Sequence, residues 1–144
     1  MSESSGGREF VKAVGIRFAL ADHARIMFFA NAFVLAHEVL EDFILHIGFA
    51  WDDYFSRDDW GLPYRYADAD YFKPLEPGAT AEARLAVERI GRSSVIYRVH
   101  FHDEAGNEAC CVRMVATTVE PATMAKRLVP DVLRERLAPF VVSH

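Results

Sequence analysis

The sequence has no long run of apolar residues. No stretch among its 144 residues approaches the roughly 18 consecutive apolar residues that a helix needs to cross a bilayer. The opening residues, MSESSGGREF, also lack the apolar core of a signal peptide. We therefore expect a cytoplasmic protein with no membrane partner, in which residues 1–8 form a disordered tail and residues 9–144 form one domain.

Cysteine is scarce and positive charge is not in excess. The chain has 2 cysteines, Cys110 and Cys111, and neighbours in a strand point to opposite faces, so a disulfide between them is not expected. This pattern is typical of a reduced, cytoplasmic protein. The net charge of −5 argues against a nucleic-acid partner. With 51% hydrophobic residues, the chain has enough apolar side chains for a globular core.

The sequence does contain one long apolar helix pattern, over residues 31–48. Asn31 is expected to cap its start, and Gly48 suits the left-handed conformation that ends a helix. The apolar positions are Phe33, Val34, Leu35, Ala36, Val39, Leu40, Phe43, Ile44, Leu45 and Ile47. The remaining narrow polar strip consists of His37, Glu38, Glu41 and Asp42. Such a helix, about 25 Å long, is expected to be buried on nearly every side.

Most of the remaining chain shows strand patterns. Strands are predicted within residues 9–19, 64–72, 79–90, 93–102 and 108–119. The last four are joined mostly by short turns, which favours antiparallel pairing. A short C-terminal helix is predicted over residues 130–140. The predicted fold class is α+β, with a curved antiparallel sheet of about five strands wrapped around one long buried helix.

The segment after the long helix is rich in aromatic and acidic residues. Residues 49–61 are interpreted as a short amphipathic helix or an ordered loop. Its aromatic residues either extend the core or line the mouth of a pocket for a flat ligand. They are Phe49, Trp51, Tyr54, Phe55 and Trp60.

This order of elements is that of the hot-dog fold, and the residues extend the likeness. Residues 18–43, FALADHARIMFFANAFVLAHEVLEDF, resemble the acyl-CoA thioesterases of the 4-hydroxybenzoyl-CoA thioesterase type. Residues 70–75 (DYFKPL), Gly78 and residues 87–94 (VERIGRSS) resemble a pattern that is widespread in the superfamily. The likeness covers residues 10–120. It implies hydrolysis of an acyl-CoA or acyl-carrier-protein thioester, no cofactor beyond the coenzyme A of the substrate, and a homodimer or homotetramer with acyl sites between joined sheets.

The resemblance assigns the catalytic carboxylate to Asp22. In the family, an aspartate in the loop before the helix has that role, and Asp22 matches its position. Arg25 stands where many members have glycine, and Phe29 and Phe33 stand near the helix start, where many have tyrosine. Asp22 is expected either to attack the thioester directly or to activate water. From spacing alone, a solvated or capping aspartate is the alternative.

Thioester hydrolysis also needs donors that polarise the carbonyl. The unpaired N–H groups and the dipole at a helix start favour an oxyanion, so the amides of Phe29, Ala30 and Asn31 are the candidates. Glu38 is a second candidate catalytic base, with a structural carboxylate as the equal alternative. We interpret His37 as structural.

Basic and hydroxyl residues surround the turn after the third predicted strand. Arg89, Arg92, Ser93 and Ser94 are predicted to bind the coenzyme A phosphates, although surface charge explains any one of them equally well. Further candidates are Arg113, Lys126 and Arg127.

No metal site is predicted. His100 and His102 share a strand face, but no acidic or cysteine cluster at ligand spacing accompanies them in the sequence.

Two other functions stay open at this point. A hot-dog dehydratase uses a helix carboxylate and a loop histidine, for which Glu38 and His23 are available, although the glycine that follows such a histidine is absent. A non-catalytic module that binds an acyl or aromatic ligand is the third possibility. The preferred reading is a thioesterase for an aromatic or polyketide-like acyl group.

Overall fold

The computed structural model describes residues 7–21 and 29–142. The elements in chain order are β1 (Phe10–Gly15), η1 (Phe18–Leu20), α1 (Asn31–His46), α2 (Trp51–Phe55), β2 (Tyr64–Tyr71), β3 (Thr80–Ile90), β4 (Ser94–His102), β5 (Glu108–Thr117), α3 (Asp131–Leu137) and η2 (Ala138–Phe140). These agree with the predicted elements except near Phe18, where strand β1 has already ended and Phe18 is 84% exposed.

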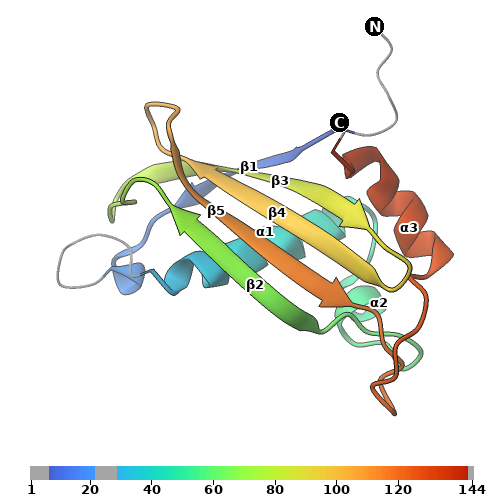
Figure 1. Ribbon diagram of the computed structural model, residues 1–144. Coiled ribbons are helices and arrows are strands. Elements are labelled where there is room, and N and C mark those ends of the chain that lie inside the picture. Colours follow the sequence, from blue (N-terminus) through green and yellow to red (C-terminus); the bar gives the residue numbers. More distant parts are fainter. Residues whose placement is uncertain (1–6, 22–28, 143–144) are drawn as a thin grey trace, which may run out of the picture.

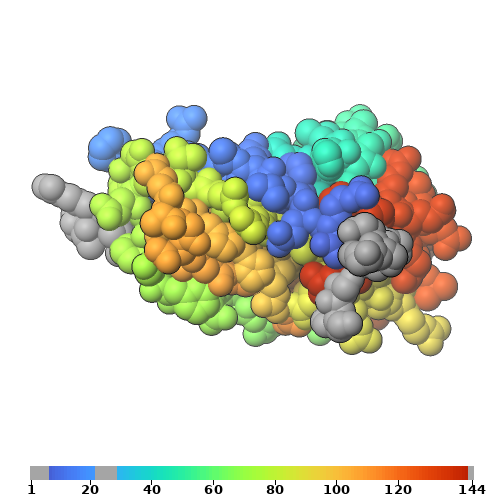
Figure 2. Space-filling model, turned by 90° about the horizontal axis from the view of Figure 1, so that it is seen from above, coloured from blue at the N-terminus to red at the C-terminus, as the bar shows by residue number. Residues whose placement is uncertain are grey.

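The five strands form one sheet in the order β1-β3-β4-β5-β2, and every neighbouring pair is antiparallel. Figure 1 shows α1 lying across one face of this sheet, with α3 at the end where β3 finishes and β4 begins. Figure 2, seen from above, shows β1 in blue crossing that side of the molecule between the red α3 and the orange β4–β5 loop. Strands β1 and β2 are therefore the two edges of the sheet.

Helix α1 buries one face rather than its whole circumference. The buried residues are Ala32, Leu35, Ala36, Val39, Leu40, Phe43 and Ile44. Val34 and Leu45 are 47% and 49% exposed, so the expectation of a helix buried on nearly every side is wrong for the single chain. The sheet covers one side of the helix, and the apolar residues outside the buried stripe remain at the surface.

The start of α1 also differs from the expectation. Ala30 occupies the cap position and no side chain caps the helix. Asn31 is the first helical residue, and its side-chain amide donates to the carbonyl of Leu20 at 3.0 Å. The predicted cap was therefore wrong, because the Asn31 side chain binds the chain that precedes the loop. At the other end, Gly48 has the expected left-handed conformation, with φ of 100°.

Strand β2 contains an irregularity that decides where its tyrosines point. Tyr64 lies opposite Ala116 and Tyr66 lies opposite Val115, with a register shift between them. Residues two apart in a regular strand share a face, whereas one extra residue in a bulge moves one of them to the other face. Tyr64 therefore faces the helix side of the sheet and Tyr66 faces the outer side.

The two cysteines lie on opposite faces, as expected. Cys110 belongs to the core, Cys111 lies opposite His100 on the outer side, and both are free thiols. The backbone amides of Gly7 and Arg8 donate to the carbonyls of Val141 and Pro139, so these two residues are attached to the domain. The predicted tail otherwise lies in residues 1–6, outside the described residues. No helix in the described ranges combines the length and apolar character of a membrane span; the cytoplasmic location stays a prediction.

Candidate functional site

The helix start is held in place from two directions. The Asn31 amide binds the carbonyl of Leu20, and the hydroxyl of Tyr71 at the end of β2 donates to the carbonyl of Phe29. The rings of Phe29 and Tyr71 also meet edge to face, with centroids 6.5 Å apart. These contacts fix the start of α1 beside the end of β2. Asp22, the predicted catalytic carboxylate, lies outside the described residues, as do His23 and Arg25.

The first amides of α1 are only partly bonded within the described residues. The amides of Ala32 and Phe33 donate to the carbonyls of Phe29 and Ala30, at 3.3 and 3.2 Å. The amides of Ala30 and Asn31 have no acceptor among the described residues. Free amides at a helix start can stabilise a developing oxyanion, so Ala30 and Asn31 are suitable donors. The role predicted for Phe29, Ala30 and Asn31 stays a prediction.

Two small residues lie on the helix side of β2 between the helix start and Tyr64. On the helix side of β2, Ala67 lies opposite Met114 and Ala69 lies opposite Val112, both core residues of β5. Ala69 is half-buried and Ala67 is exposed in the single chain. The helix side of β2 therefore carries short side chains at these two positions between Tyr71 and Tyr64.

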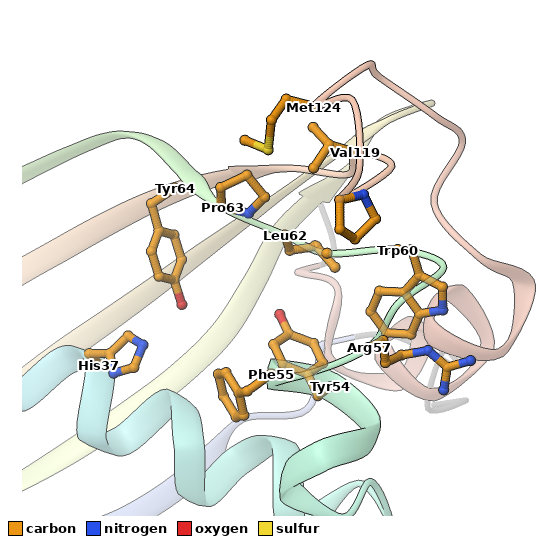
Figure 3. A pocket seen from close by; sticks show the side chains of 12 residues that line it. His37, Tyr54, Phe55, Arg57, Trp60, Leu62, Pro63, Tyr64, Val119 and Met124 are labelled. Carbon is orange, nitrogen blue, oxygen red and sulfur yellow. The ribbon is translucent and has the colours of Figure 1, made fainter.

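A pocket of about 320 Å³ lies at the Tyr64 end of β2. Figure 3 shows its side chains converging from α1, α2, the start of β2 and the segment after β5. Its lining residues are His37, Tyr54, Phe55, Arg57, Trp60, Gly61, Leu62, Pro63, Tyr64, Val119, Pro121 and Met124. This volume and the predominance of ring side chains suit a small, flat, mostly apolar ligand.

Both interpretations of the aromatic segment hold in part. Phe49, Tyr54 and Trp60 are buried core residues, while Tyr54, Phe55 and Trp60 also line the pocket. Trp51 is exposed and outside it. Sequence analysis missed Tyr64 and Met124 as pocket residues. The only signal for Tyr64 was its place at the start of an expected strand, and the segment carrying Met124 had no recognised pattern.

The polar strip of α1 faces this region. Nδ1 of His37 lies 3.2 Å from a carboxylate oxygen of Glu41, and the His37 ring meets Tyr64 edge to face at 5.7 Å. His37 thus lines the pocket, which the structural interpretation of this residue did not anticipate. Glu38 is exposed and has no hydrogen-bond or ion-pair partner among the described residues. Its role as a second base stays a prediction.

A second hollow, of about 470 Å³, lies on the outer side of the sheet at the same end of β2. It is lined by Arg65, Tyr66, Ser93, Ser94, Ile96, Arg113, Val115, Thr117 and Lys126. Four residues that the sequence nominated for phosphate binding therefore lie together: Ser93, Ser94, Arg113 and Lys126. The predicted Arg89 and Arg92 are exposed and do not line it, and Arg127 donates to the carbonyl of Asp59.

The outer face also holds an ion cluster that the sequence did not reveal. His100 Nδ1 lies 2.5 Å from Glu108, its Nε2 lies 4.0 Å from Cys111 Sγ, and Arg98 lies 3.8 Å from that sulfur. The statement that no acidic or cysteine partner accompanies the histidine pair is therefore wrong in three dimensions. The partners were missed because they come from the neighbouring strand.

This cluster is better suited to an ion pair than to a metal. Hydrogen bonds to Cys111 and Glu108 raise the pKa of His100 to about 9, which favours imidazolium, whereas a metal needs the neutral ring. Arg98 also places a positive charge beside the thiol. The absence of a metal site stays a prediction.

Comparison with known proteins identifies the group to which the chain belongs. Residues 16–137 match the thioesterase-like superfamily. The 1,4-dihydroxy-2-naphthoyl-CoA hydrolase of Prochlorococcus marinus (strain NATL2A) is 30% identical over 118 residues, which are 77% of this chain and 76% of that protein.

Solved structures share the fold. A putative thioesterase from Prochlorococcus marinus str. MIT 9313 has a TM-score of 0.84 at 23% identity, covering 90% of this chain and 94% of that one. A 1,4-dihydroxy-2-naphthoyl-CoA thioesterase from Synechocystis has a TM-score of 0.83 at 16% identity, covering 90% and 96%. The predicted hot-dog architecture is thus confirmed. Because the family match spans most of its length, the chain belongs to the thioesterase-like superfamily, and the predicted enzyme class, a thioester hydrolase, is confirmed.

Proposed function

We propose that this thioesterase hydrolyses an aromatic acyl-CoA, of the 1,4-dihydroxy-2-naphthoyl type that its named relatives act on. The observation that carries this proposal is the ring-lined pocket of about 320 Å³ beside α1. A straight acyl chain gains little from ring faces, whereas a flat aromatic group can stack on them or meet their edges.

The distance from the helix start to the aromatic pocket suits this substrate. His37 lies six residues after Asn31, which is about 9 Å along the helix axis. Between these points the edge strand presents Ala67 and Ala69 towards the helix. A thioester carbonyl placed over the first amides of α1 can therefore extend a ring system along this path into the pocket.

The chemistry follows from the amides at the helix start and from the carboxylate that the resemblance assigns. The amides of Ala30 and Asn31 stabilise negative charge on the carbonyl oxygen. Asp22 removes a proton from water that attacks the carbonyl carbon, or attacks that carbon itself to form an anhydride that water then opens. In both routes the carbon–sulfur bond breaks and the coenzyme A thiolate leaves. The reaction needs only these groups and no further cofactor.

The coenzyme A end fits the cationic hollow of a second chain. Strand β2 is an open edge, and its unpaired backbone groups can join the same edge of another copy in antiparallel orientation. Such pairing brings the Arg65 end of one strand opposite the Tyr71 end of the other. The hollow with Lys126, Ser93 and Ser94 would then lie near the partner's helix start, within reach of the phosphates.

A thiol-release assay over an acyl-CoA panel tests the proposed function. We expect kcat/KM for 4-hydroxybenzoyl-CoA or 1,4-dihydroxy-2-naphthoyl-CoA to exceed that for hexanoyl-CoA and palmitoyl-CoA at least tenfold. Equal or faster release from the straight chains would contradict the aromatic assignment. Binding of the aromatic thioesters without thiol release would favour a ligand-binding module, and loss of water from a hydroxyacyl thioester would favour a dehydratase.

A further inference from the structure

The aromatic pocket has one polar end, formed by His37 and Tyr64. Figure 3 shows the Tyr64 hydroxyl pointing from the start of β2 towards His37 on α1. The Nδ1 atom of His37 is occupied by Glu41 at 3.2 Å. The Nε2 atom of His37 and the hydroxyl of Tyr64 have no hydrogen-bond partner among the described residues. Two polar atoms at the same end of an apolar pocket are thus left for a ligand.

The hydroxyl of Tyr54 and the guanidinium of Arg57, which also line the pocket, are already paired. The hydroxyl of Tyr54 lies 2.9 Å from that of Tyr97, both buried. Arg57 donates to Asp59 through two nitrogens, at 2.8 and 2.9 Å, and its guanidinium lies over the Trp60 ring. These contacts engage the Tyr54 hydroxyl and the Arg57 guanidinium with neighbouring protein groups.

From this contrast we propose that Tyr64 and His37 select an acyl group whose ring carries a hydroxyl; this inference rests on the proposed aromatic acyl-CoA substrate. Tyr64 donates to, or accepts from, the ring hydroxyl, and His37 Nε2 bonds to it from the helix. Glu41 fixes the orientation of the His37 ring through Nδ1, so that Nε2 is directed at the ligand. All three are specificity or positioning residues, and none takes part in breaking the thioester.

The protonation state of Tyr64 agrees with this role. Burial, together with the nearby Tyr54 and Glu41, raises the pKa of Tyr64, so its hydroxyl remains a neutral donor across the working range of pH. A ring without a hydroxyl would leave both polar atoms facing an apolar surface, which is unfavourable.

The backbone at the rim of the pocket has an unusual conformation at Met124. Met124 lines it and has φ of 61°, the one non-glycine residue with positive φ in the described ranges. Such a conformation is costly and is maintained only where surrounding contacts impose it. The amides of Met124 and Ala125 are both bonded, to Glu120 and to Thr123. A thioether is well suited to contact the face or edge of a ring.

The size of the expected preference for a hydroxylated ring follows from the solvent exposure of Tyr64. A closed site that hydrogen-bonds a substrate hydroxyl rejects the analogue without it by about 10⁴–10⁵-fold. Tyr64 is 38% exposed in the single chain, so water can replace part of the lost bond. We therefore expect a selection of roughly tenfold to a hundredfold, or about 1.4–2.7 kcal/mol.

The test compares 1,4-dihydroxy-2-naphthoyl-CoA with 2-naphthoyl-CoA on the full chain. Wild type should prefer the hydroxylated substrate in kcat/KM by at least tenfold. Tyr64→Phe, which removes one oxygen, should lower kcat/KM for the hydroxylated substrate about tenfold and change that for 2-naphthoyl-CoA less than threefold. His37→Gln should reduce the same preference, whereas His46→Gln, on the same helix but outside the pocket, should not change it.

The outcomes separate this inference from the proposed function. If wild type releases thiol from both naphthoyl substrates without preference, or if Tyr64→Phe lowers both equally, the selection is overturned and the aromatic thioesterase stands. If wild type hydrolyses neither, both fail. Should Tyr64→Phe unfold, shown by its melting curve, His37→Gln decides the question with the same pair of substrates.

Discussion

The two faces of the sheet differ in whether their polar groups are paired. On the outer face, Glu88 binds Arg98 and Arg113 through four contacts of 2.6–3.2 Å, and Glu108 binds His100. On the helix face, the amides of Ala30 and Asn31, the Nε2 atom of His37 and the hydroxyl of Tyr64 lack partners among the described residues. The outer charges are satisfied by each other, whereas the inner groups are available to a substrate.

This difference shows that clusters of charged residues are poor guides to the site here. A paired charge stabilises the fold and has little left to offer a ligand. An unpaired donor beside an apolar pocket costs stability and is explained by binding. Substitutions of the unpaired groups on the helix face should therefore affect turnover, and substitutions of the paired charges on the outer face should affect stability.

The largest effect is expected for Asp22→Asn. It keeps the shape of the side chain and removes the base or nucleophile, so kcat should fall roughly 10²–10⁴-fold, the scale of a positioned general base. The melting temperature should not change. Asp52→Asn, on the exposed face of α2, is the matched control and should retain full activity. An Asp22→Asn enzyme within a few-fold of wild type would refute the mechanism.

Glu88→Gln should give the opposite result, with lower stability and normal turnover. Hydrogen bonds from Arg113 and Arg98 lower the pKa of Glu88 from 4.5 to about 2. Because the folded pKa lies below the unfolded one, this stabilisation is present above pH 4.5 and is lost as pH falls towards 2. Allowing for solvent screening, we expect a loss of about 1–2 kcal/mol at neutral pH.

Urea unfolding at pH 7 and pH 3 checks this prediction. The difference between Glu88→Gln and wild type should shrink at the lower pH, because at pH 3 Glu88 is protonated in the unfolded protein while it is still mostly ionised in the folded protein. Glu82→Gln, whose partner Arg84 is more exposed, should change the melting temperature much less. A reduced kcat in a folded Glu88→Gln enzyme would break the contrast between the two faces.

Substitutions in the cationic hollow should affect only the binding of the coenzyme A part of the substrate. Lys126→Ala should raise KM for an acyl-CoA about threefold to tenfold, with kcat unchanged, because phosphate contacts are equal in ground and transition states. An acyl-N-acetylcysteamine, which lacks the nucleotide, should not respond. Arg127→Ala and Arg92→Ala should raise KM less than Lys126→Ala does. A tenfold rise in KM for Arg92→Ala alone would instead favour phosphate binding by the turn of residues 89–94.

The smallest effect is expected for Glu38→Gln. Glu38 is exposed and adjoins the pocket residue His37. Removal of its charge should therefore lower kcat only a few-fold. Turnover and melting temperature measured on the same preparation decide its role. A fall in melting temperature with unchanged kcat would make it structural.

The elements could be predicted because their signals are local. Alternation along residues 80–90 and 94–102, and the helical spacing after Asn31, are properties of neighbouring residues. What surrounds each element is not local. Val34 and Leu45 are as apolar as the buried residues of α1. The sequence therefore does not indicate which face of the helix the sheet leaves uncovered.

The site was predicted in part for the same reason. Resemblance nominated Asp22, which lies outside the described residues and stays a prediction; the turn nominated Ser93 and Ser94, which line the outer hollow, and their role stays a prediction. Tyr64 was missed because its importance depends on a bulge in β2 and on a helix residue far away in sequence. The ion pair of His100 with Glu108 depends on strand register, which a motif search on one strand does not contain.

The bulge in β2 has an evolutionary consequence. It places both Arg65 and Tyr66 at the outer hollow while Tyr64 stays opposite Ala116 in the pocket. Arg65 behaves as an inserted residue: deleting its codon would leave Tyr64 and Tyr66 on their present faces and remove one cation from the hollow. One insertion or deletion at this position would thus change the proposed coenzyme A site and leave the proposed acyl pocket unchanged.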